Sequence, residues 1–212
     1  MGISGRSPGT PTLDRWAERD LLVRPTNVSM DRTEIVIRSI VTADAATVAD
    51  LHTTSWRSAY RGMLRDEYLD GDIATERRQV WSTRLATPVA ANYGFIAESE
   101  AAPVGFVFML GDNDPTWGTL VDNLHVLPGL KGRGIGRRLL EAAALETVRR
   151  YPDQRVHLFV YEANHDARRF YARVGGREVE RGHVEAPGGG AQVHWRVAWD
   201  DPAHLLSAVS TS

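Results

Sequence analysis

A basic, glycine-rich segment between an apolar run and a helix-forming run constrains this chain most. The apolar run ends at Leu127-Pro128, residues 131–136 hold three glycines, and a helix-like pattern follows to Arg150. The start of a helix leaves backbone N–H groups unpaired and carries partial positive charge. Glycines let a phosphate approach these groups without meeting a Cβ. The order of strand, glycine turn and helix therefore predicts a pyrophosphate-binding site.

The spacing of the glycines separates this segment from other phosphate-binding motifs. A dinucleotide-binding fingerprint, G-x-G-x-x-G, fits Gly132 and Gly134 but fails at Arg137. A Walker A loop requires Gly-Lys-Ser/Thr, which is absent here. The alternative of a nucleotide-binding domain with another fold is disfavoured by this register. Four cations add positive charge to the segment: Lys131, Arg133, Arg137 and Arg138.

Three segments of the chain resemble the GNAT family of N-acetyltransferases. The family signature Gln/Arg-x-x-Gly-x-Gly/Ala appears as Lys131-Gly132-Arg133-Gly134-Ile135-Gly136, with a lysine that lacks the planar guanidinium fork. Residues 161–176 resemble Asn-x-x-Ala-x-x-Phe-Tyr-x-x-x-Gly-Phe, with Gly176 in place of the last Phe. Residues 51–64 resemble the Ser-Trp-Arg-x-Ala-Tyr-Arg-Gly segment of one subgroup. The resemblance covers roughly residues 34–198.

This resemblance implies an α/β fold (an α+β mixed sheet) whose splayed central sheet carries helices on both faces. It implies acetyl-CoA as cosubstrate and direct acetyl transfer to a primary amine of a small molecule or peptide. In relatives the pantetheine arm pairs with an exposed strand edge, here Leu124-His125-Val126, and the N–H of Val126 or Leu127 would stabilise the oxyanion. The cofactor-binding residues implied are Leu124, His125, Val126, Leu127, Lys131, Gly132, Arg133, Gly134, Ile135, Gly136, Arg137, Asn164 and Tyr171.

Asn164 and Tyr171 receive roles from the same resemblance. They are seven residues apart, which is about two helical turns, so they share a face. In relatives the Asn binds the pantetheine arm, and the Tyr donates a proton to the departing thiolate. Asn164 is also a good helix N-cap, and Tyr171 is also compatible with core packing.

The general base has three candidates: Asp122, His125 and Glu162. Asp122 and His125 lie on opposite faces of a regular strand, so at most one faces the acceptor unless a bulge intervenes. His125 has a suitable ordinary pKa, although a single strand histidine is commonly structural. An ordered water that relays the proton is the alternative.

The acceptor site is expected at Trp56 and Tyr60, which are four residues apart on one helix face. Core packing is the common role for such a pair, and an aromatic wall that attracts an ammonium is the other. An acidic patch for polyamines is compatible with Asp66, Glu67, Asp70, Asp72 and Glu76, but such a run is usually a solvated helix face. Peptide N-termini are equally compatible.

The composition excludes several classes of function. The 212 residues carry a net charge of -2, with no overall bias toward nucleic acid or an anionic membrane. The chain has no cysteine, so disulfides, thiolate nucleophiles and an acyl-cysteine route are excluded, and no metal is expected. With no membrane-length apolar run and no apolar signal core, a cytoplasmic enzyme is the expectation.

The patterns predict one domain over 34–198, after a disordered or partly helical extension over 1–33 and before a tail over 199–212. A short helix over 13–24 and a start at Met30 are both compatible with the extension. Predicted strands are 34–40, 92–98, 103–110, 116–126, 155–160, 177–184 and 191–198. Predicted helices are 44–60, 66–85, 134–150 and 164–174.

Two further hypotheses stay open from sequence alone. One is a GNAT-shaped module that binds acyl-CoA as a sensor without catalysis, against which Tyr171 argues. The other concerns assembly, for which a homodimer is compatible with the sequence but not specified by it.

Overall fold

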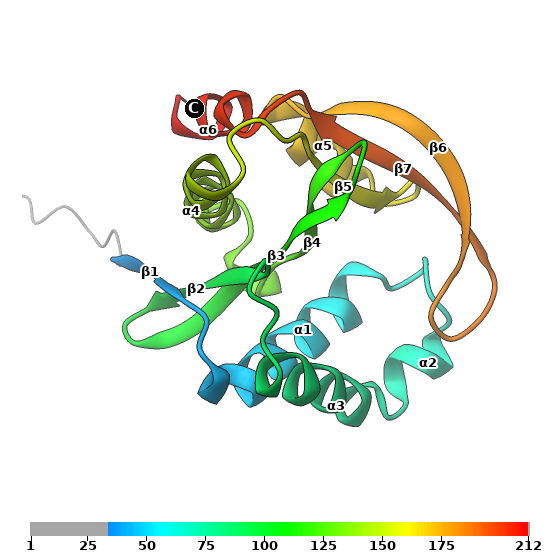
Figure 1. Ribbon diagram of the computed structural model, residues 1–212. Coiled ribbons are helices and arrows are strands. Elements are labelled where there is room, and N and C mark those ends of the chain that lie inside the picture. Colours follow the sequence, from blue (N-terminus) through cyan, green and yellow to red (C-terminus); the bar gives the residue numbers. More distant parts are fainter. Residues whose placement is uncertain (1–33, 212) are drawn as a thin grey trace, which may run out of the picture. The chain divides into compact units, whose positions relative to one another are not determined.

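The computed structural model describes residues 34–211. Within them, seven strands form one sheet in the order β1-β2-β3-β4-β5-β7-β6 (Figure 1). β4 and β5 run parallel, whereas the other neighbouring pairs are antiparallel. The strands are β1 (Ile35–Ser39), β2 (Tyr93–Ser99), β3 (Ala102–Asp114), β4 (Gly118–Val126), β5 (Val156–Tyr161), β6 (Arg177–Glu185) and β7 (Ala191–Trp199). The predicted mixed sheet is confirmed, and the predicted helix over 13–24 and Met30 lie outside the described residues.

Helices cover both faces of the sheet, as predicted. They are α1 (Ala45–Ala59), α2 (Asp66–Asp70), α3 (Ile73–Ala86), α4 (Ile135–Arg150), α5 (His165–Arg173) and α6 (Pro202–Ser210). α1 and α3 pack together below β2 and β3 in Figure 1, and α4 lies on the opposite face. None of the helices in residues 34–211 has both the length and the apolar character needed to span a membrane.

Two apolar layers hold these elements. On the α4 side, Ile135, Leu139 and Leu140 are buried at helical spacing against the sheet. On the α1 and α3 side, Trp81 packs edge-on against Phe106, with ring centroids 5.4 Å apart. The first half of the sheet is therefore packed on both faces, and this fixes the end of β4 that carries the candidate site.

The single helix predicted over 66–85 is wrong, because the chain breaks at Gly71 between α2 and α3. The Arg57 Nε donates to the carbonyl oxygen of Leu69 at 2.9 Å, and its Nη2 donates to that of Gly71 at 3.3 Å. These contacts use backbone acceptors that a continuous helix would direct to its own N–H groups. An arginine on α1 thus stabilises the break.

Within the tail predicted over 199–212, residues 202–210 form the helix α6. Asp201 caps this helix by accepting from the backbone N–H of His204 at 2.7 Å, and Pro202 occupies its first turn. Leu205 and Val209 are fully buried against α4. The packed part of the chain therefore extends past residue 198.

Candidate active site

β4 and β5 separate soon after they meet. Their paired residues are Thr119 with Val156 and Leu120 with His157, and β4 then continues without β5 to Val126. The backbone N–H of Leu127 donates to Val104 of β3 at 2.9 Å. Because successive N–H groups of a strand point to opposite edges, the N–H groups of Val126 and Leu124 point to the open edge.

The prediction that the N–H of Leu127 could stabilise the oxyanion is wrong. The N–H of Leu127 is directed into the β3 ladder, so it is not available to a ligand on the β5 side. The N–H of Val126 stays available at the open edge, which also offers the carbonyl group of the same residue to an added strand.

The glycine-rich cradle, residues 131–136, follows this edge and ends in α4. Gly132 and Gly134 both have φ +79, a left-handed backbone that favours glycine. A Cβ built on either glycine would meet no atom within 4 Å, so the space in front of the backbone is open. No side chain caps the first turn of α4. This leaves N–H donors directed at open space, which is the arrangement that binds phosphate.

The charge around the cradle is unbalanced. Across residues 34–211, none of its four cations forms an ion pair: Lys131, Arg133, Arg137 and Arg138. The other arginines around the sheet are mostly paired with carboxylates, as Arg84 is with Asp122. Unpaired cations beside a helix N-terminus add electrostatic attraction for a multiply charged anion.

A β-bulge brings two of the predicted bases to one face. Phe108 pairs with Asn123 and Met109 with Val121, so Asp122 is the extra residue of β4. Asp122 forms an ion pair with Arg84 of α3 at 2.6 Å, and His125 contacts Ser55 of α1. Both side chains therefore face the layer of α1 and α3. In a regular strand Asp122 and His125 would face opposite sides, so the bulge is what brings them to the same side.

His125 lies in a compact polar and aromatic group. Its Nδ1 is 3.0 Å from the Ser55 hydroxyl, and its ring stacks on His52 with centroids 4.8 Å apart. Burial, assisted by the charge of Lys131, lowers the pKa of His125 to about 3. The imidazole is therefore neutral at physiological pH and has one ring nitrogen with a lone pair for a proton.

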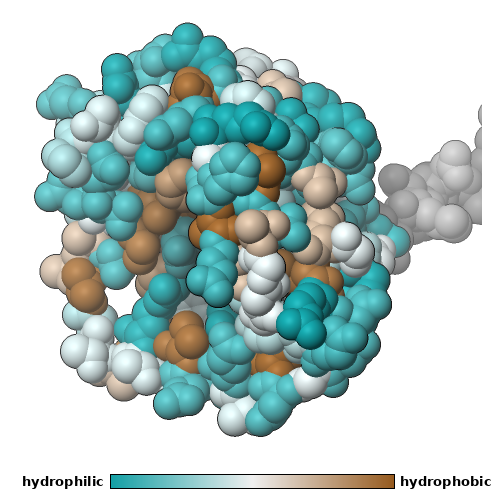
Figure 2. All heavy atoms as spheres, turned by 90° about the vertical axis from the view of Figure 1, so that its right-hand side faces the viewer, coloured by the Kyte–Doolittle hydropathy of each residue, from teal (hydrophilic) through white to brown (hydrophobic). Residues whose placement is uncertain are grey.

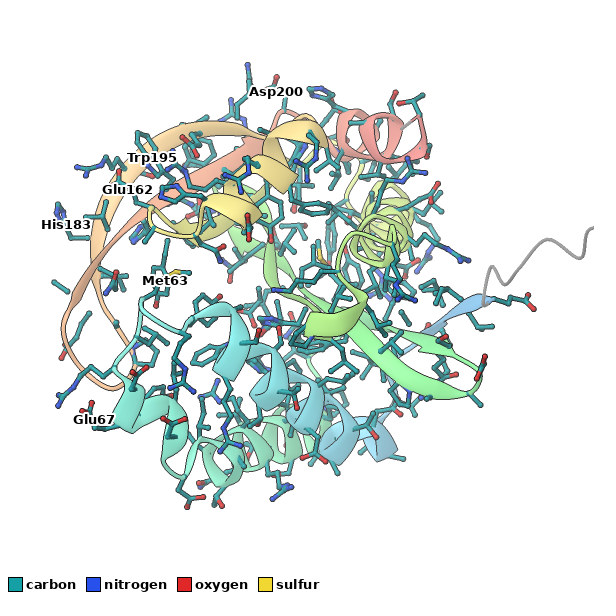
Figure 3. All side chains as sticks on the ribbon, turned by 180° about the vertical axis from the view of Figure 1, so that it is seen from behind. Met63, Glu67, Glu162, His183, Trp195 and Asp200 are labelled. Carbon is teal, nitrogen blue, oxygen red and sulfur yellow. The ribbon has the colours of Figure 1, made fainter. Side chains whose placement is uncertain are left out.

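Asp122 and Glu162 are both held by arginines. Asp122 also accepts from Asn123 at 2.5 Å. Glu162, just after β5, accepts from Arg181 at 2.8 and 2.9 Å and from the Trp195 indole at 3.2 Å. The Arg181 hydrogen bonds lower the pKa of Glu162 to about 2. Figure 3 labels Glu162 and Trp195, which lie near the end of β5. Both carboxylates are thus held by an arginine and a second donor, whereas within residues 34–211 His125 has only the Ser55 contact at one ring nitrogen, so the geometry favours His125.

Three tyrosines lie close together beyond the point where β4 and β5 separate: Tyr60 just after α1, Tyr161 at the end of β5 and Tyr171 of α5. The rings of Tyr60 and Tyr161 are 5.5 Å apart. Burial, assisted by the hydroxyl of Tyr60, raises the pKa of Tyr171, so its hydroxyl stays protonated. Within residues 34–211 no protein hydrogen bond engages the hydroxyl of Tyr171, as the role of proton donor to a ligand requires.

Asn164 is the N-cap of α5, as one of its two predicted roles requires. Its side chain accepts from the backbone N–H of Ala167 at 3.2 Å. The amide nitrogen of Asn164 donates to no acceptor within residues 34–211, so the predicted contact with a ligand stays a prediction.

Trp56 of α1 and Tyr60, the residue after its end, lie side by side with ring centroids 5.3 Å apart. The guanidinium of Arg77 already covers the Trp56 ring at 4.8 Å. This cation occupies the position that the sequence assigned to a substrate ammonium. Both aromatics also pack beside a small apolar cluster of Leu64, Leu69, Ile73 and Ala186.

The hairpin of β6 and β7 reaches the loop after α1. The amide of Gln192 donates to the backbone carbonyl of Met63 at 2.7 Å, and a Cβ on Gly188 would lie 2.4 Å from Tyr68. The face that carries this hairpin is hollowed, and hydrophobic side chains border the hollow (Figure 2). The hairpin thus contacts the segment after α1, although the two are far apart in sequence.

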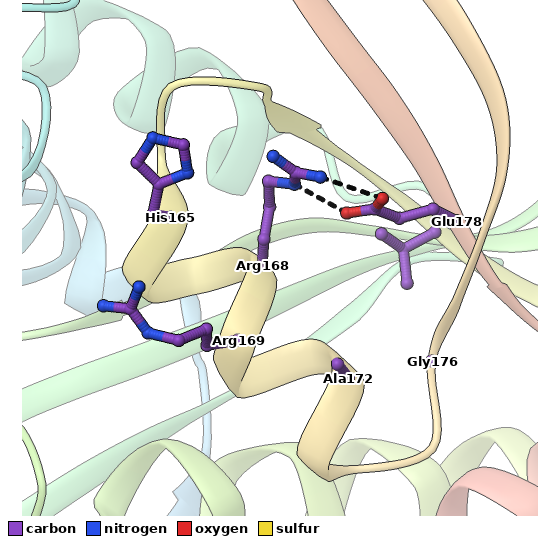
Figure 4. A pocket seen from close by; sticks show the side chains of 7 residues that line it. His165, Arg168, Arg169, Ala172, Gly176 and Glu178 are labelled. Atoms are coloured by element: carbon purple, nitrogen blue, oxygen red, sulfur yellow. Dashed lines mark hydrogen bonds and ion pairs between the residues drawn. The ribbon is translucent and has the colours of Figure 1, made fainter.

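Another hollow, of about 460 Å³, lies on the outer side of α5. Figure 4 shows Arg168 across it, paired with Glu178 at 2.6 Å. It contains neither the cradle nor a candidate base, so it is not part of the candidate site. Its lining residues are His165, Arg168, Arg169, Ala172, Gly176, Glu178 and Val197.

Sequence reasoning missed Ser55, His52, Arg77 and Tyr161. His52, Ser55 and Trp56 are three and four residues apart, so helical spacing places them on one face. That signal was available in the chain. No local signal placed Arg77 over Trp56, because the contact depends on how α3 packs against α1.

The comparisons with known proteins agree with this geometry. Residues 48–176 match the family model of the Acetyltransferase (GNAT) family. A "Probable N-acetyltransferase" of Mycobacterium tuberculosis is 29% identical over 68% of this chain and 80% of its own length.

Solved structures show the same fold. PaiA N-acetyltransferase from Thermoplasma acidophilum, in complex with coenzyme A, has a TM-score of 0.62 at 16% identity, over 78% of this chain and 99% of that one. YncA from Salmonella typhimurium, solved with acetyl-CoA, has a TM-score of 0.57 at 17% identity, over 78% and 93%. With a splayed sheet, a glycine cradle and a family match over more than half its length, the chain belongs to the GNAT acetyltransferase family.

Proposed function

We propose that the protein transfers the acetyl group of acetyl-CoA to a primary amine of a small molecule or peptide. The observation that carries the proposal is the open edge of β4 leading directly into an empty cradle with unpaired cations. An elongated anion with amide groups fits this arrangement, since its phosphates meet the cradle and its amides meet the edge. Coenzyme A bound to PaiA, and acetyl-CoA bound to YncA, support the choice of cosubstrate.

Acetyl-CoA would supply the acetyl thioester, and this chain's residues would handle the charges and protons. The N–H of Val126 is available to the carbonyl oxygen as it gains negative charge. His125, which lies beside Ser55 with a neutral imidazole, accepts the proton that the attacking amine loses, directly or through a water. Tyr171, protonated through its raised pKa, donates a proton to the sulfur as the carbon–sulfur bond breaks.

The test is a panel of primary amines with acetyl-CoA, followed by release of free thiol and by mass spectrometry of the product. Acetylation of at least one amine class at a rate that depends on amine concentration supports the proposal. Tight acetyl-CoA binding without turnover of any amine favours the non-catalytic sensor instead. Calorimetry with acetyl-CoA, CoA, NAD and ATP adds a second criterion, because preference for NAD or ATP contradicts the proposal.

A further inference from the structure

Arg77 is an arginine with unused hydrogen-bonding capacity. Its side chain is only 12% exposed, and its guanidinium lies 4.8 Å above the ring of Trp56. The Nη2 group is paired with Glu76, whereas the Nε group is buried and has no partner. An arginine carries five N–H donors, and leaving one buried and unpaired costs free energy. Arg77 is therefore arranged to accept a further anionic partner.

His52 supplies a second unpaired donor beside the same indole. Its ring meets that of Trp56 at 4.9 Å, and its Nδ1 accepts from the Trp81 indole at 2.9 Å. Because an indole N–H only donates, the proton of the neutral imidazole must be on Nε2. That nitrogen is buried without a partner. Burial, with help from the charges of His125 and Arg77, lowers the pKa of His52, so the ring stays neutral.

The carboxylates that would suit a polyamine are largely engaged. Asp66 and Asp70 accept from Arg61, both at 2.9 Å. Glu76 accepts from the Tyr68 hydroxyl at 2.8 Å and from Arg77. The acidic segment therefore neutralises the protein's own arginines, and two N–H donors beside Trp56 remain without acceptors. This region is complementary to an anion rather than to a second cation.

We propose that Arg77 and His52 form a carboxylate-binding subsite of the acceptor site, so that the preferred acceptors are amines that also carry a carboxylate. This inference rests on the proposed acetyl transfer. The subsite is close to the reacting groups, because His52 stacks on His125 at 4.8 Å. Glu76 is 44% exposed, so an incoming carboxylate can replace it on the guanidinium at little cost. Arginine suits this task, since its fork matches a carboxylate.

The experiment compares amines that differ only in the carboxylate: β-alanine with propylamine, and ε-aminocaproate with hexylamine. The proposal expects at least one carboxylated member to have a kcat/KM about tenfold or more above that of its plain partner, mainly through a lower KM. Equal values within both pairs, or a preference for the plain amines, would overturn it. No turnover with any amine would instead defeat the proposed function itself, so the two failures are distinguishable.

Variants assign the preference to Arg77. Arg77→Gln should remove the advantage of the carboxylated amine and leave KM for acetyl-CoA unchanged, and Arg77→Lys should retain part of it. Arg78→Gln is the matched control, because Arg78 directly follows Arg77 in α3 but pairs with Asp50 at the exposed surface. Thermal unfolding verifies that each variant is folded. An unchanged preference in folded Arg77→Gln contradicts the assignment, as does an equal loss in Arg78→Gln.

Discussion

Single residues set the chemistry of the candidate site. Gly134 is in the left-handed region because the chain must turn into α4 there, and its missing Cβ keeps the cradle open. Burial keeps both His125 and Tyr171 neutral, because it lowers the pKa of the imidazole and raises that of the phenol.

Gly134→Glu tests the cradle. The substitution strains a backbone at φ +79 and directs a carboxylate into the space in front of the N–H groups, so we expect acetyl-CoA affinity to fall below detection by calorimetry. Gly62→Glu is the control, since Gly62 has φ +78 and equally empty surroundings but lies in the loop after α1. Unchanged affinity in a folded Gly134→Glu protein would falsify the cradle.

Tyr171→Phe tests the proton donor. We expect kcat to fall by about 10²–10⁴, the usual contribution of a general acid, with little change in acetyl-CoA affinity. Steady-state kinetics and calorimetry measure the two quantities. Tyr151→Phe is the control, because its hydroxyl donates to the carbonyl oxygen of Ala91 at 3.4 Å, at the C-terminal end of α4. Near wild-type turnover in Tyr171→Phe would mean that Tyr171 only packs in the core and does not donate the proton.

Elements show most clearly how far sequence reasoning extends. The strands and α4 follow from apolar spacing and turn residues, and their predicted bounds agree with the structure within a few residues. The bulge at Asp122 could not be predicted, because its pairing partner Phe108 is distant in sequence. The break at Gly71 depends on Arg57 for the same reason. In contrast, α6 carried a local signal, Asp201-Pro202 before spaced apolar residues, that was overlooked.

Leu205→Ala tests whether α6 is part of the packed domain. Leu205 is fully buried against α4, so truncation should lower the free energy of unfolding by about 2–5 kcal/mol in urea titrations. Leu206→Ala is the matched control, because Leu206 is only partly buried and should cost less. Equal, small losses for both variants would mean that α6 contributes little to the core.

In the sheet as a whole, β1 to β4 are paired along their length, whereas β4 and β5 separate and leave an open edge. The family resemblance predicted this arrangement, together with the cradle and the identity of the fold. It did not indicate the cluster of Arg77, His52 and Trp56, because these residues come together only when α3 packs on α1.

Buried neutral histidines predict how stability depends on pH. Burial lowers the pKa of His125 to about 3, that of His157 to about 4, and that of His52 further. Below about pH 6.5 the histidines of the unfolded chain bind protons, whereas the buried rings of the native state stay neutral. The histidines therefore do not reduce the free energy of unfolding above that pH, and they reduce it progressively as the pH decreases toward about 4. Urea unfolding at about pH 7.5 and about pH 5 measures this change. Constant or higher stability at the lower pH would contradict the burial of neutral rings.

The unpaired edge of β4 affects how readily the protein aggregates in solution. Exposed N–H and C=O groups at Leu124 and Val126 are a template on which a strand of another chain can add. A cosubstrate that pairs with this edge would compete with such addition and, by mass action, stabilise the native state by about 2.7 kcal/mol at a hundred times its Kd. We therefore expect the protein to aggregate more readily as its cosubstrate is depleted, so that cosubstrate supply governs the lifetime of the protein as well as its turnover.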